Sequence, residues 1–521
     1  MKQTLKLGTR RSLLAWAQSS WVAREIERLN PETQVELVGI DTRGDQNQAS
    51  NIPLHQLKDQ GKEFFVAELD TALREKNVDV TVHSLKDLSL DRPKEFVLGA
   101  IPRRENPRDA ILFGPRTMDR LKRGKTLRIG TSSPRRVENI PTFLQSALPG
   151  GQAKVEFIEI RGNVNTRLAR VQEAEDSPRY LDGVVLAFAG LIRLWADEKA
   201  RTEMRALLNG VRWMILPLRE CPAAPGQGAL AVECRADDAR VRQALSRLHD
   251  ATAADHVALE REVLATSGGG CHQRFGATAF AASPGLSRLM YVRGKWPNGA
   301  MVDELRWEAP AAVAKGGAAS ARAWDGTEWR RRGDVSEAGG TLTSEATPWS
   351  SAAGEAVFVA HSRAADVFGD PGARIGRARV WTSGTPSWFR LARAGVWVEG
   401  CAEGLGYDFV EPTLHEPVLQ LPTRWTVLTH TSATGWDSEK RVIATYEVSE
   451  EAYDDEARAA LKSATHVYWS SASQFDQLSH LASRDAVHAC GPGKTARHLS
   501  TKGVRHDVFP SSDDWRKWVS G

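Results

Sequence analysis

The 521-residue sequence predicts an α/β fold divided among several domains, and three observations support that prediction. The chain is longer than one ordinary hydrophobic core allows, which favours three or four domains of about 100 to 200 residues each. Short apolar runs alternate with segments of helical period along most of the chain, as in folds with mainly parallel sheets. This alternation changes between residues 240 and 310, which indicates a small α+β domain.

The first elements should place an acidic side chain at the end of a strand. A short strand is expected at residues 5–8, and Ser12 then caps a helix whose apolar residues recur near the helical period. A second helix at 63–76 precedes an alternating strand at 78–82, which the residues His-Ser-Leu-Lys-Asp follow. Because α/β folds place their chemistry at the carboxyl ends of strands, we expect Asp87, the last of these residues, to line a cleft.

The later elements repeat the alternation after one interruption. A second α/β block is expected from strands at 127–130 and 184–188, with helical segments between them. A helix at 257–266, a glycine turn and a strand at 289–293 then form the α+β domain. Residues 339–354, rich in Gly, Ser, Thr and Ala, indicate a linker. Beyond it the apolar runs predict a further α/β unit with strands at 357–360, 378–382, 426–429, 441–448 and 466–470.

The bulk composition excludes several classes of protein. Lys and Arg exceed Asp and Glu by only 4 (69 against 65), too even a balance for a dedicated nucleic-acid or membrane-surface protein. The five cysteines include no CxxC pair and no Cys/His group at metal-ligand spacing, which argues against a disulfide framework and a structural zinc site. The N-terminus lacks the apolar stretch of a signal peptide and no run is long enough to span a membrane, so we expect a cytoplasmic protein.

Arginines gather at turn-like positions, which points to an acidic ligand. Arg suits bidentate binding of carboxylates, because its planar fork matches two oxygens and stays charged. Before Arg135 and Arg136, Ser133 is expected as a helix N-cap and Pro134 as the first helical residue, so backbone N–H groups would face the same anion. A solvated charged surface remains the alternative for any single pair. The turn-like arginines are Arg10, Arg11, Arg103, Arg104, Arg108, Arg135, Arg136, Arg161, Arg167 and Arg193.

A single thiol lies on a glycine run at residues 268–272, Gly-Gly-Gly-Cys-His. Glycine removes the side chains that would shield the sulfur and tolerates unusual backbone angles, so Cys271 suits a covalent attachment site. With Asp87 as a general acid, the two residues together indicate covalent chemistry. A half-buried cysteine on a glycine-rich turn remains the alternative for the thiol alone.

Eight short motifs occur along the first 310 or so residues in the order typical of one family. Together they resemble the porphobilinogen deaminases, also called hydroxymethylbilane synthases, over nearly this whole region. Any one motif could arise by chance, whereas eight in order leave little room for another family. The motifs are 9–12 (TRRS), 41–45 (DTRGD), 83–87 (HSLKD), 106–110 (NPRDA), 131–136 (TSSPRR), 161–167 (RGNVNTR), 225–229 (PGQGA) and 269–271 (GGC).

The resemblance implies a three-domain enzyme followed by a C-terminal unit. The first two domains would be α/β domains like those of periplasmic binding proteins, hinged around a cleft, and the third a small α+β domain that carries the thiol. The family precedent is a monomer without metal or nucleotide. The implied boundaries are 1–105 with a return segment near 215–235, 106–214, 236–335, a linker at 336–354 and a C-terminal α/β domain at 355–521.

The resemblance also implies the chemistry. Cys271 would hold a dipyrromethane cofactor, two linked pyrrole rings, through a thioether. Four molecules of the substrate porphobilinogen would be added head to tail before water releases hydroxymethylbilane. Asp87 would protonate the departing amine, stabilise the cationic intermediate and assist proton loss from the ring. Each porphobilinogen brings an acetate and a propionate, so the growing chain needs arginines around it.

The site residues that the motifs carry over fall into two groups. Those expected to bind the cofactor, besides Cys271, are Asp45, Lys86, Ser132, Ser133, Arg135, Arg136 and Gln227. Those expected to bind substrate are Arg10, Ser12, Lys58, Lys62, Phe65, Arg161, Arg167 and Arg193. Phe65 would stack on a pyrrole ring, although its helix position also permits a core role. The departures from the family are Leu13 in place of proline, Leu85 in place of methionine, the residues 272–275, and a one-residue shift at Lys58.

The C-terminal residues 355–521 resemble, more weakly, the uroporphyrinogen III synthases, the next enzymes of the pathway. Val448 stands where that family has threonine, and the segment is shorter than the family's two α/β domains. Whether it is a working synthase or a structural appendage stays open. A working synthase would limit the escape of hydroxymethylbilane, which cyclises spontaneously to the wrong isomer. The candidate second site comprises Tyr446 on a strand, Ser470 and Ser471 at one turn, and Thr495 at another.

Three other functions fit parts of the sequence less well. A nucleotide site at 490–496 (CGPGKTA) lacks the required first glycine, which His488 replaces. A carboxylate-binding module on the same hinged fold would explain the arginines but has no need of Asp87 and Cys271. A cysteine hydrolase would use Cys271 with His272, yet neighbours in sequence rarely point together and no third residue is evident.

Overall fold

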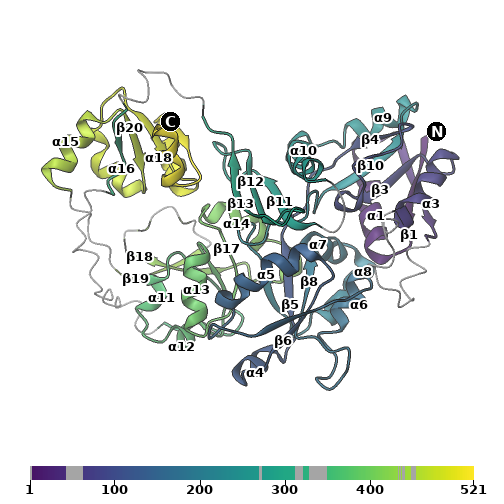
Figure 1. Ribbon diagram of the computed structural model, residues 1–521, viewed down its shortest axis with the longest axis horizontal. Coiled ribbons are helices and arrows are strands. Elements are labelled where there is room, and N and C mark those ends of the chain that lie inside the picture. Colours follow the sequence, from purple (N-terminus) through teal and green to yellow (C-terminus); the bar gives the residue numbers. More distant parts are fainter. Residues whose placement is uncertain are drawn as a thin grey trace.

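The computed structural model describes residues 3–42, 63–268, 273–310, 321–327, 349–431, 433, 436, 440–446 and 453–520. Within these ranges the chain is a mixed α/β protein with five β-sheets, which confirms the predicted α/β class. Figure 1 shows the N-terminal sheet at the right, the second sheet low in the centre, the three-stranded sheet above it and the C-terminal end at the upper left.

The first sheet has the strand order β2-β1-β3-β10-β4. Its core consists of the apolar faces of the strands and of helix α1, with Leu7, Val80 and Ile26 fully buried. Ser12 is the N-cap of α1, as predicted, although its side chain makes no capping hydrogen bond. The elements are β1 (Gln3–Arg10), α1 (Leu13–Leu29), β2 (Thr33–Ile40), α3 (Glu63–Arg74), β3 (Val80–Ser84), η3 (Leu85–Asp87), β4 (Phe96–Ala100), β10 (Leu230–Arg235) and α9 (Ala239–Ser246).

The second sheet has the order β7-β6-β8-β5-β9. Ser133 is the N-cap of helix α5 and Pro134 its first residue, as the sequence predicted. The elements are β5 (Asp109–Phe113), α4 (Thr117–Lys122), β6 (Leu127–Gly130), α5 (Pro134–Ala147), β7 (Val155–Ile158), α6 (Val164–Ala169), β8 (Gly183–Ala187), α7 (Phe188–Ala196), α8 (Glu198–Leu207) and β9 (Arg212–Ile215).

Each of these two sheets contains one reversed strand, which corrects the prediction of mainly parallel pairing. β10 is antiparallel to β3 and β4, and β5 is antiparallel to β8 and β9, so half of the pairings in each sheet are antiparallel. Both reversed strands follow a crossing of the chain between the sheets, through residues 101–108 and 216–229. A strand that arrives by such a crossing enters its sheet from the opposite end. The two crossings also join the sheets side by side.

The third sheet is antiparallel and packs against one helix, in the stretch where an α+β arrangement was expected. Its order is β11-β12-β13, and helix α10 supplies Val263 and Leu264 to the core that it shares with the sheet. The elements are α10 (Ala251–Thr266), β11 (Arg274–Phe280), β12 (Leu289–Lys295) and β13 (Met301–Trp307).

The C-terminal region forms two parallel sheets where the sequence predicted a single α/β unit. Their orders are β17-β16-β15-β18-β19 and β14-β20-β21-β22. The two residues of β14 are too few for a periodic signal, so their pairing with β20 was not foreseeable. The elements are β14 (Ala323–Trp324), β15 (Ala356–Val359), α11 (Arg363–Asp366), α12 (Pro371–Ile375), β16 (Arg379–Thr382), α13 (Thr385–Arg393), β17 (Val398–Cys401), α14 (Tyr407–Leu414), η5 (Pro417–Leu419), β18 (Trp425–His430), β19 (Lys440–Tyr446), α15 (Asp455–Ser463), β20 (His466–Trp469), α16 (Ala472–Leu478), η6 (Ser479–Leu481), β21 (Val487–Cys490), α17 (Lys494–Thr501), β22 (His506–Val508) and α18 (Ser512–Ser520).

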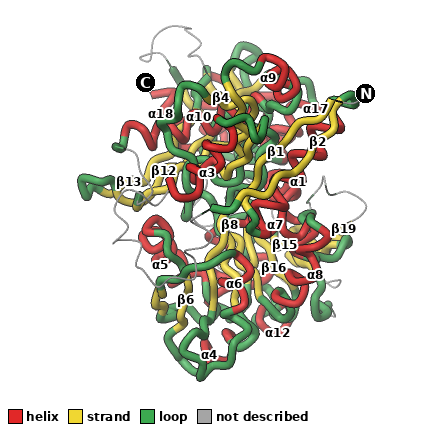
Figure 2. Tube along the Cα trace, turned by 90° about the vertical axis from the view of Figure 1, so that its right-hand side faces the viewer, coloured by secondary structure: helices red, strands yellow, loops and turns green. Residues whose placement is uncertain are grey.

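The first C-terminal sheet shares a hydrophobic core with the second sheet. Buried residues of both belong to one cluster, and the strands β8, β15 and β16 lie in the same region of Figure 2. The Trp397 indole donates to the carbonyl of Trp213 on β9 (2.9 Å) and packs edge-on against Phe113 (5.1 Å between centroids). The Trp388 indole donates to the carbonyl of Ala147 at the end of α5 (3.1 Å). These contacts make the C-terminal sheet part of the cover of the second sheet.

A buried ion pair fixes the same interface beside the first crossing. Arg108 donates to Glu403 at 2.7 Å, and their side chains are only 7% and 1% exposed. Glu403 also accepts from the backbone N–H of Arg219 in the second crossing (3.1 Å), and Arg108 lies over the ring of Phe409 (4.9 Å). The Glu403 carboxylate therefore links both crossing segments, through Arg108 and Arg219, to the C-terminal region.

Replacing Glu403 with Ala is expected to destabilise the protein by about 3–5 kcal/mol, because it leaves the Arg108 charge buried without its partner. Denaturant unfolding of the full chain measures this change. The exposed pair of Glu304 and Arg306 on β13 supplies the control, and Glu304→Ala should cost at most about 1 kcal/mol. Equal stability of the two variants would contradict a structural role for the Glu403 pair.

Candidate active site

Asp87 lies at the carboxyl end of β3, on the short turn η3, with an exposed side chain. This is the position that the strand pattern predicted. Asp87 interacts electrostatically with Arg167 on α6, beside the second sheet. The pKa of Arg167 is lowered to about 10 by burial and by the charge of Arg136, while the negative charge of Asp87 opposes this shift. The carboxylate of Asp87 at the end of the first sheet thus interacts electrostatically with one cation from the second.

Lys86 begins a polar network that links the two sheets. Its ammonium group donates to Oε1 of Gln227 (3.2 Å), whose amide nitrogen donates to Oδ1 of Asp109 (2.9 Å) and to the carbonyl of Pro107 (2.7 Å). Burial lowers the pKa of Lys86, and the adjacent Asp87 opposes this shift. Lys86 and Gln227, both expected to bind the cofactor, thus contact each other beside the residues at which the chain crosses between the sheets.

Asp109 holds Arg135 and Arg136 together beneath the start of α5. Arg135 donates to Oδ2 (2.8 Å) and Arg136 to Oδ1 (2.7 Å), and all three side chains are buried. Burial on its own would raise the pKa of Asp109, but the two guanidinium groups outweigh it and hold the pKa well below its ordinary value. Two cations share one carboxylate, so the cluster carries an excess positive charge.

One buried N–H of this cluster has no hydrogen-bond partner among the described residues: Nε of Arg135. The same guanidinium donates from Nη1 to the carbonyl of Pro222 (2.8 Å). Ser132 and Ser133, both half-buried, lie beside it at the N-terminus of α5, where the backbone N–H groups and the helix dipole favour an anion. The cluster therefore offers unused donors to an acidic ligand.

The remaining expected substrate residues that the structure describes lie on separate elements. Arg193 on α7 donates to the carbonyl of Gly228 in the second crossing (2.6 Å), and burial lowers its pKa to about 10. Arg161, half-buried, has Nη2 at 3.9 Å from Glu159. Arg10 and Ser12 flank the end of β1 and the start of α1. The structure thus brings Arg135, Arg136 and Gln227 into contact with the Asp109 carboxylate, and Lys86 into contact with Gln227. It describes no such contact for Arg193, Arg161, Arg10 or Ser12.

Several expected residues lie outside the described part of the chain. They are Asp45, Lys58, Lys62, Cys271 and the neighbouring His272; Phe65 belongs to α3, but its side chain also lies outside. The four cysteines that the structure describes are all buried, and burial raises the pKa of each thiol, to about 11 for Cys234 and about 12 for Cys490. Such thiols are poor nucleophiles at neutral pH.

Two important acidic residues were not identified as site residues from the sequence. Asp109 belongs to the motif at 106–110, but its pairing with arginines 26 and 27 residues away depends on the folded chain. Glu260, fully buried on α10, accepts from Arg104 (2.7 Å) and from the backbone N–H groups of Gly226 and Ala279 (both 2.7 Å). A glutamate among the mostly apolar residues of the buried face of α10 was the signal that could have indicated it.

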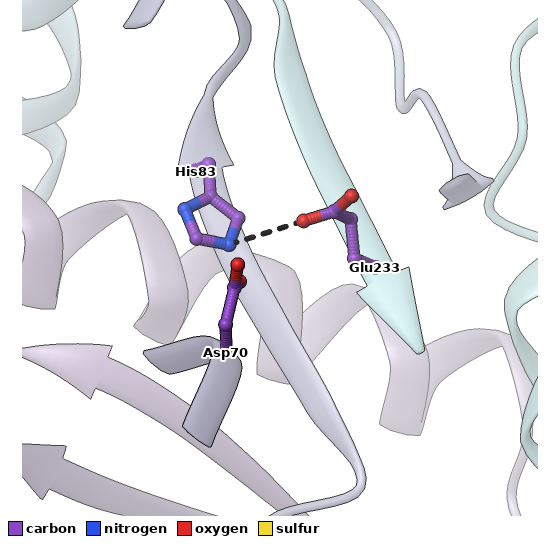
Figure 3. Close-up of side chains that lie close together, drawn as sticks. All are labelled: Asp70, His83 and Glu233. Carbon is purple, nitrogen blue, oxygen red and sulfur yellow. Dashed lines mark ion pairs between the residues drawn. The ribbon is translucent and has the colours of Figure 1, made fainter. Parts of the chain in front are cut away.

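A second cluster of ionisable groups lies under the same strand. Figure 3 shows His83, Asp70 and Glu233 pointing toward one another, with Nε2 of His83 at 3.4 Å from Glu233. Their ligand atoms lie within 4.8 Å of one another, as a metal site requires. Arg92, however, donates to both Asp70 (2.7 Å) and Glu233 (2.8 Å), so a guanidinium already supplies the positive charge. We interpret the cluster as an ion network that supports β3.

His83 should make the protein less stable in acid. Burial, with Arg92 and Arg10 nearby, lowers its pKa from 6.5 to about 3. Because the unfolded chain binds this proton more tightly, the contribution of His83 to stability is complete above pH 6.5 and is lost as the pH falls toward 3. Denaturant unfolding between pH 7 and pH 5 should show a smaller loss of stability for His83→Gln than for the wild type. Equal losses would contradict a neutral buried His83.

The residues of the candidate second site lie on both C-terminal sheets. Tyr446 ends β19 and is buried, with its ring 5.9 Å from that of His430. Ser471 is the N-cap of α16 and accepts from the N–H of Gln474 (3.1 Å), while the Ser470 hydroxyl donates to Oε1 of Gln474 (3.0 Å). Thr495 lies in the first turn of α17. The described contacts do not join Tyr446, the two serines and Thr495 to one another across the two sheets.

Comparison with known proteins identifies the family. The model of the family "Porphobilinogen deaminase, dipyromethane cofactor binding domain" matches residues 5–243. The chain is 36% identical to the porphobilinogen deaminase of Syntrophotalea carbinolica over 312 residues, covering 60% of this chain and 89% of that protein. It is 40% identical to porphobilinogen deaminase 1 of Streptomyces avermitilis over 298 residues, covering 56% and 84%. The first part of the chain is thus a domain that binds a dipyrromethane cofactor, and the chain belongs to the porphobilinogen deaminase family.

The similar solved structures add no further argument. A mutant uroporphyrinogen III synthase from Thermus thermophilus covers 32% of this chain and 77% of its own, with 14% identity and a TM-score of 0.23. The effector-binding domain of BenM with benzoate covers 51% and 95%, with 12% identity and a TM-score of 0.24. TM-scores this low support no inference about function. Among the helices that the structure describes, none is long and apolar enough to cross a membrane.

Proposed function

We propose that the protein polymerises four porphobilinogen molecules head to tail on a covalent dipyrromethane primer, with release of ammonia and then of hydroxymethylbilane. The observation that carries this proposal is the position of Asp87, exposed at the end of β3 and in electrostatic interaction with Arg167 of the second sheet. Family membership supports the same reaction. The two sheets would act as hinged halves, as in periplasmic binding proteins, and the protein would act as a monomer.

The residues around Asp109 fit the acidic side chains of a dipyrromethane. The cluster has an excess positive charge, and Nε of Arg135 is a buried donor without a partner in the described structure. Lys86, Ser132, Ser133, Arg136 and Gln227 would hold the cofactor together with Arg135. The cofactor supplies the nucleophilic pyrrole carbon from which the chain grows. Cys271 would anchor it, because the other four cysteines are buried thiols with raised pKa values.

Asp87 would act on both proton transfers of each cycle. Its protonated carboxyl would donate to the departing amine of porphobilinogen, and the carboxylate left behind would stabilise the positive charge on the substrate. The same oxygen would then accept the ring proton after coupling. Arg10, Arg161, Arg167 and Arg193, with Ser12, Lys58 and Lys62, would bind the acetates and propionates of substrate and product. Arg167 and Arg193 keep their charge at neutral pH, since their pKa values stay near 10.

Incubation of the full chain with porphobilinogen tests this function against that of a passive carboxylate-binding module. The deaminase should release one ammonia for each porphobilinogen consumed and form a linear tetrapyrrole that turns into a coloured porphyrin on acid oxidation. A binding module would release no ammonia and form no tetrapyrrole. Binding of porphobilinogen without ammonia release would therefore refute the proposed function.

We also propose that the C-terminal region cyclises hydroxymethylbilane to uroporphyrinogen III. The motifs around Tyr446, Ser470, Ser471 and Thr495 support this second activity, and so does the division of the region into two parallel sheets. The sheets approach closely where Gly406, before α14, meets Gly493, before α17. Chromatography of the oxidised product should show the type III isomer from the full chain. Type I alone, as from spontaneous cyclisation, would refute the second activity.

A further inference from the structure

The turn η3, which carries Asp87, has few hydrogen bonds of its own. The N–H of Leu88, its C-cap, donates to the carbonyl of Leu85 (3.1 Å), and the N–H of Leu85 donates to the carbonyl of Ala229 (3.1 Å). Ser84, its N-cap, makes no side-chain capping hydrogen bond. A short 3-10 turn leaves its last carbonyls without partners inside the turn. The position of Asp87 therefore depends on groups outside η3 that bind these carbonyls.

One arginine of the third domain binds carbonyls on both sides of Asp87. Arg261 on α10 donates from Nη2 to the carbonyl of Ser89 at 2.9 Å. Its Nη1 donates to the carbonyls of Leu88 (3.3 Å) and Leu85 (3.5 Å). The guanidinium group presents several N–H donors in a fixed planar fork, so one side chain can hold both ends of the turn at once.

Electrostatic interactions also attach Arg261 to the strand before the turn. Arg261 is half-buried, and burial lowers its pKa. The negative charge of Glu233 on β10, the strand that pairs with β3, opposes this shift. Glu233 in turn pairs with Arg92 and contacts His83, so it belongs to the ion network under β3. The guanidinium group thus interacts both with this network and with the turn that follows β3.

The residue before Arg261 attaches the same helix to the second crossing. Glu260 accepts from the backbone N–H of Gly226 at 2.7 Å. Gly226 has a φ of +77°, which favours glycine, and a Cβ on it would lie 3.3 Å from the backbone N of Lys86 and 3.3 Å from the Leu85 side chain. The crossing therefore packs closely on η3. Two consecutive residues of α10 thus contact the turn itself and the segment packed against it.

We propose that Arg261 is a positioning residue for the deaminase reaction, because it holds η3 so that the carboxyl group of Asp87 stays in place through each proton transfer. A general acid must lie within hydrogen-bond reach of the group it protonates, and a displacement of about 1 Å can cost about 10²-fold in rate. The inference rests on the proposed function for the reaction, and the contacts of Arg261 support it. Arg261 lies outside the eight motifs, which do not indicate this role.

Steady-state kinetics of porphobilinogen consumption test the proposal on the full chain. Arg261→Gln removes both the charge and the fork, and kcat should fall about 10- to 100-fold because the carboxyl group of Asp87 is displaced. KM should change little, since none of the residues expected to bind substrate lies on α10 or η3. Arg261→Lys keeps the charge without the fork and should recover only part of kcat. Intact mass gives the fraction of cofactor-loaded protein, and kcat is expressed per loaded molecule.

Backbone hydrogen exchange provides a readout that does not depend on activity. The N–H of Leu88 should exchange about tenfold faster or more in Arg261→Gln, as expected when hydrogen bonds from a charged group are lost. The matched control is Arg288→Gln, which removes the exposed ion pair of Arg288 with Asp255 on α10 and no described contact with η3. This control should exchange and turn over like the wild type. Thermal unfolding checks that all variants are folded.

The outcomes separate this proposal from the proposed reaction. A wild-type kcat in Arg261→Gln would overturn the positioning role even if the protein forms hydroxymethylbilane. Unchanged exchange at Leu88 would overturn it as well, and so would an equal loss of kcat in Arg288→Gln, because general loosening of α10 would then be the cause. Conversely, faster exchange in Arg261→Gln without ammonia release by the wild type would refute the deaminase reaction and leave the hold of Arg261 on the turn in place.

Discussion

Asp87→Asn should stop porphobilinogen turnover while leaving the protein folded and loaded with its dipyrromethane. Asn has nearly the same shape but cannot donate or accept the proton of a carboxyl group, and general acid–base catalysis typically contributes about 10²–10⁴-fold. The side chain is exposed on η3, so its replacement should cost little stability. Cofactor attachment, which we assign to Cys271, should be preserved.

Ammonia release and intact mass, measured on the same sample, check this result. The matched control is Asp91→Asn, which replaces another exposed aspartate four residues along the chain and should turn over like the wild type. Normal turnover by Asp87→Asn would contradict the assignment of Asp87 as the proton donor. Loss of both cofactor and turnover would instead show a role in cofactor retention.

Asp109→Ala should destabilise the protein by about 3–5 kcal/mol, because it leaves the buried charges of Arg135 and Arg136 without their shared carboxylate. It also removes an acceptor of Gln227, so the network to Lys86 should loosen. We propose that this network binds the cofactor. Asp109→Ala protein that still folds should therefore retain less dipyrromethane.

Denaturant unfolding and intact mass measure the two effects of Asp109→Ala. Asp119→Ala is the control, because Asp119 is exposed on α4 and its loss should change stability by about 0.5 kcal/mol or less. A stability like that of the control would show that the two arginines do not need Asp109. If Asp109→Ala is destabilised but keeps its full cofactor content, then Asp109 stabilises the fold and has no role in holding the cofactor.

Local signals in the sequence predicted many elements well. Ser133 and Pro134 predict the start of α5, and the alternation of apolar and polar residues before Asp87 predicts β3. Both predictions succeed because helix capping and strand periodicity depend on residues close in sequence. The return of β10 to the first sheet and the pairing of β14 with β20 depend on contacts across more than a hundred residues. No local pattern encodes such pairings.

In the candidate active site, too, the sequence predicted features that depend on local signals and missed those that depend on long-range contacts. The type and order of residues predicted an acidic side chain at the end of β3 and arginines around an acidic ligand. The buried partners of those arginines, Asp109 for Arg135 and Arg136 and Glu260 for Arg104, appear only once the chain is folded. The tie of Arg108 to Glu403 likewise joins the deaminase motifs to a region that the motifs do not cover.

The central claim is that a dipyrromethane is bound covalently through Cys271, and the intact mass of the denatured protein tests it most directly. The wild type should be heavier than its sequence by two pyrrole units with their acidic side chains, and Cys271→Ala should match its sequence mass. An unmodified wild type, or the same excess in Cys271→Ala, would contradict the claim.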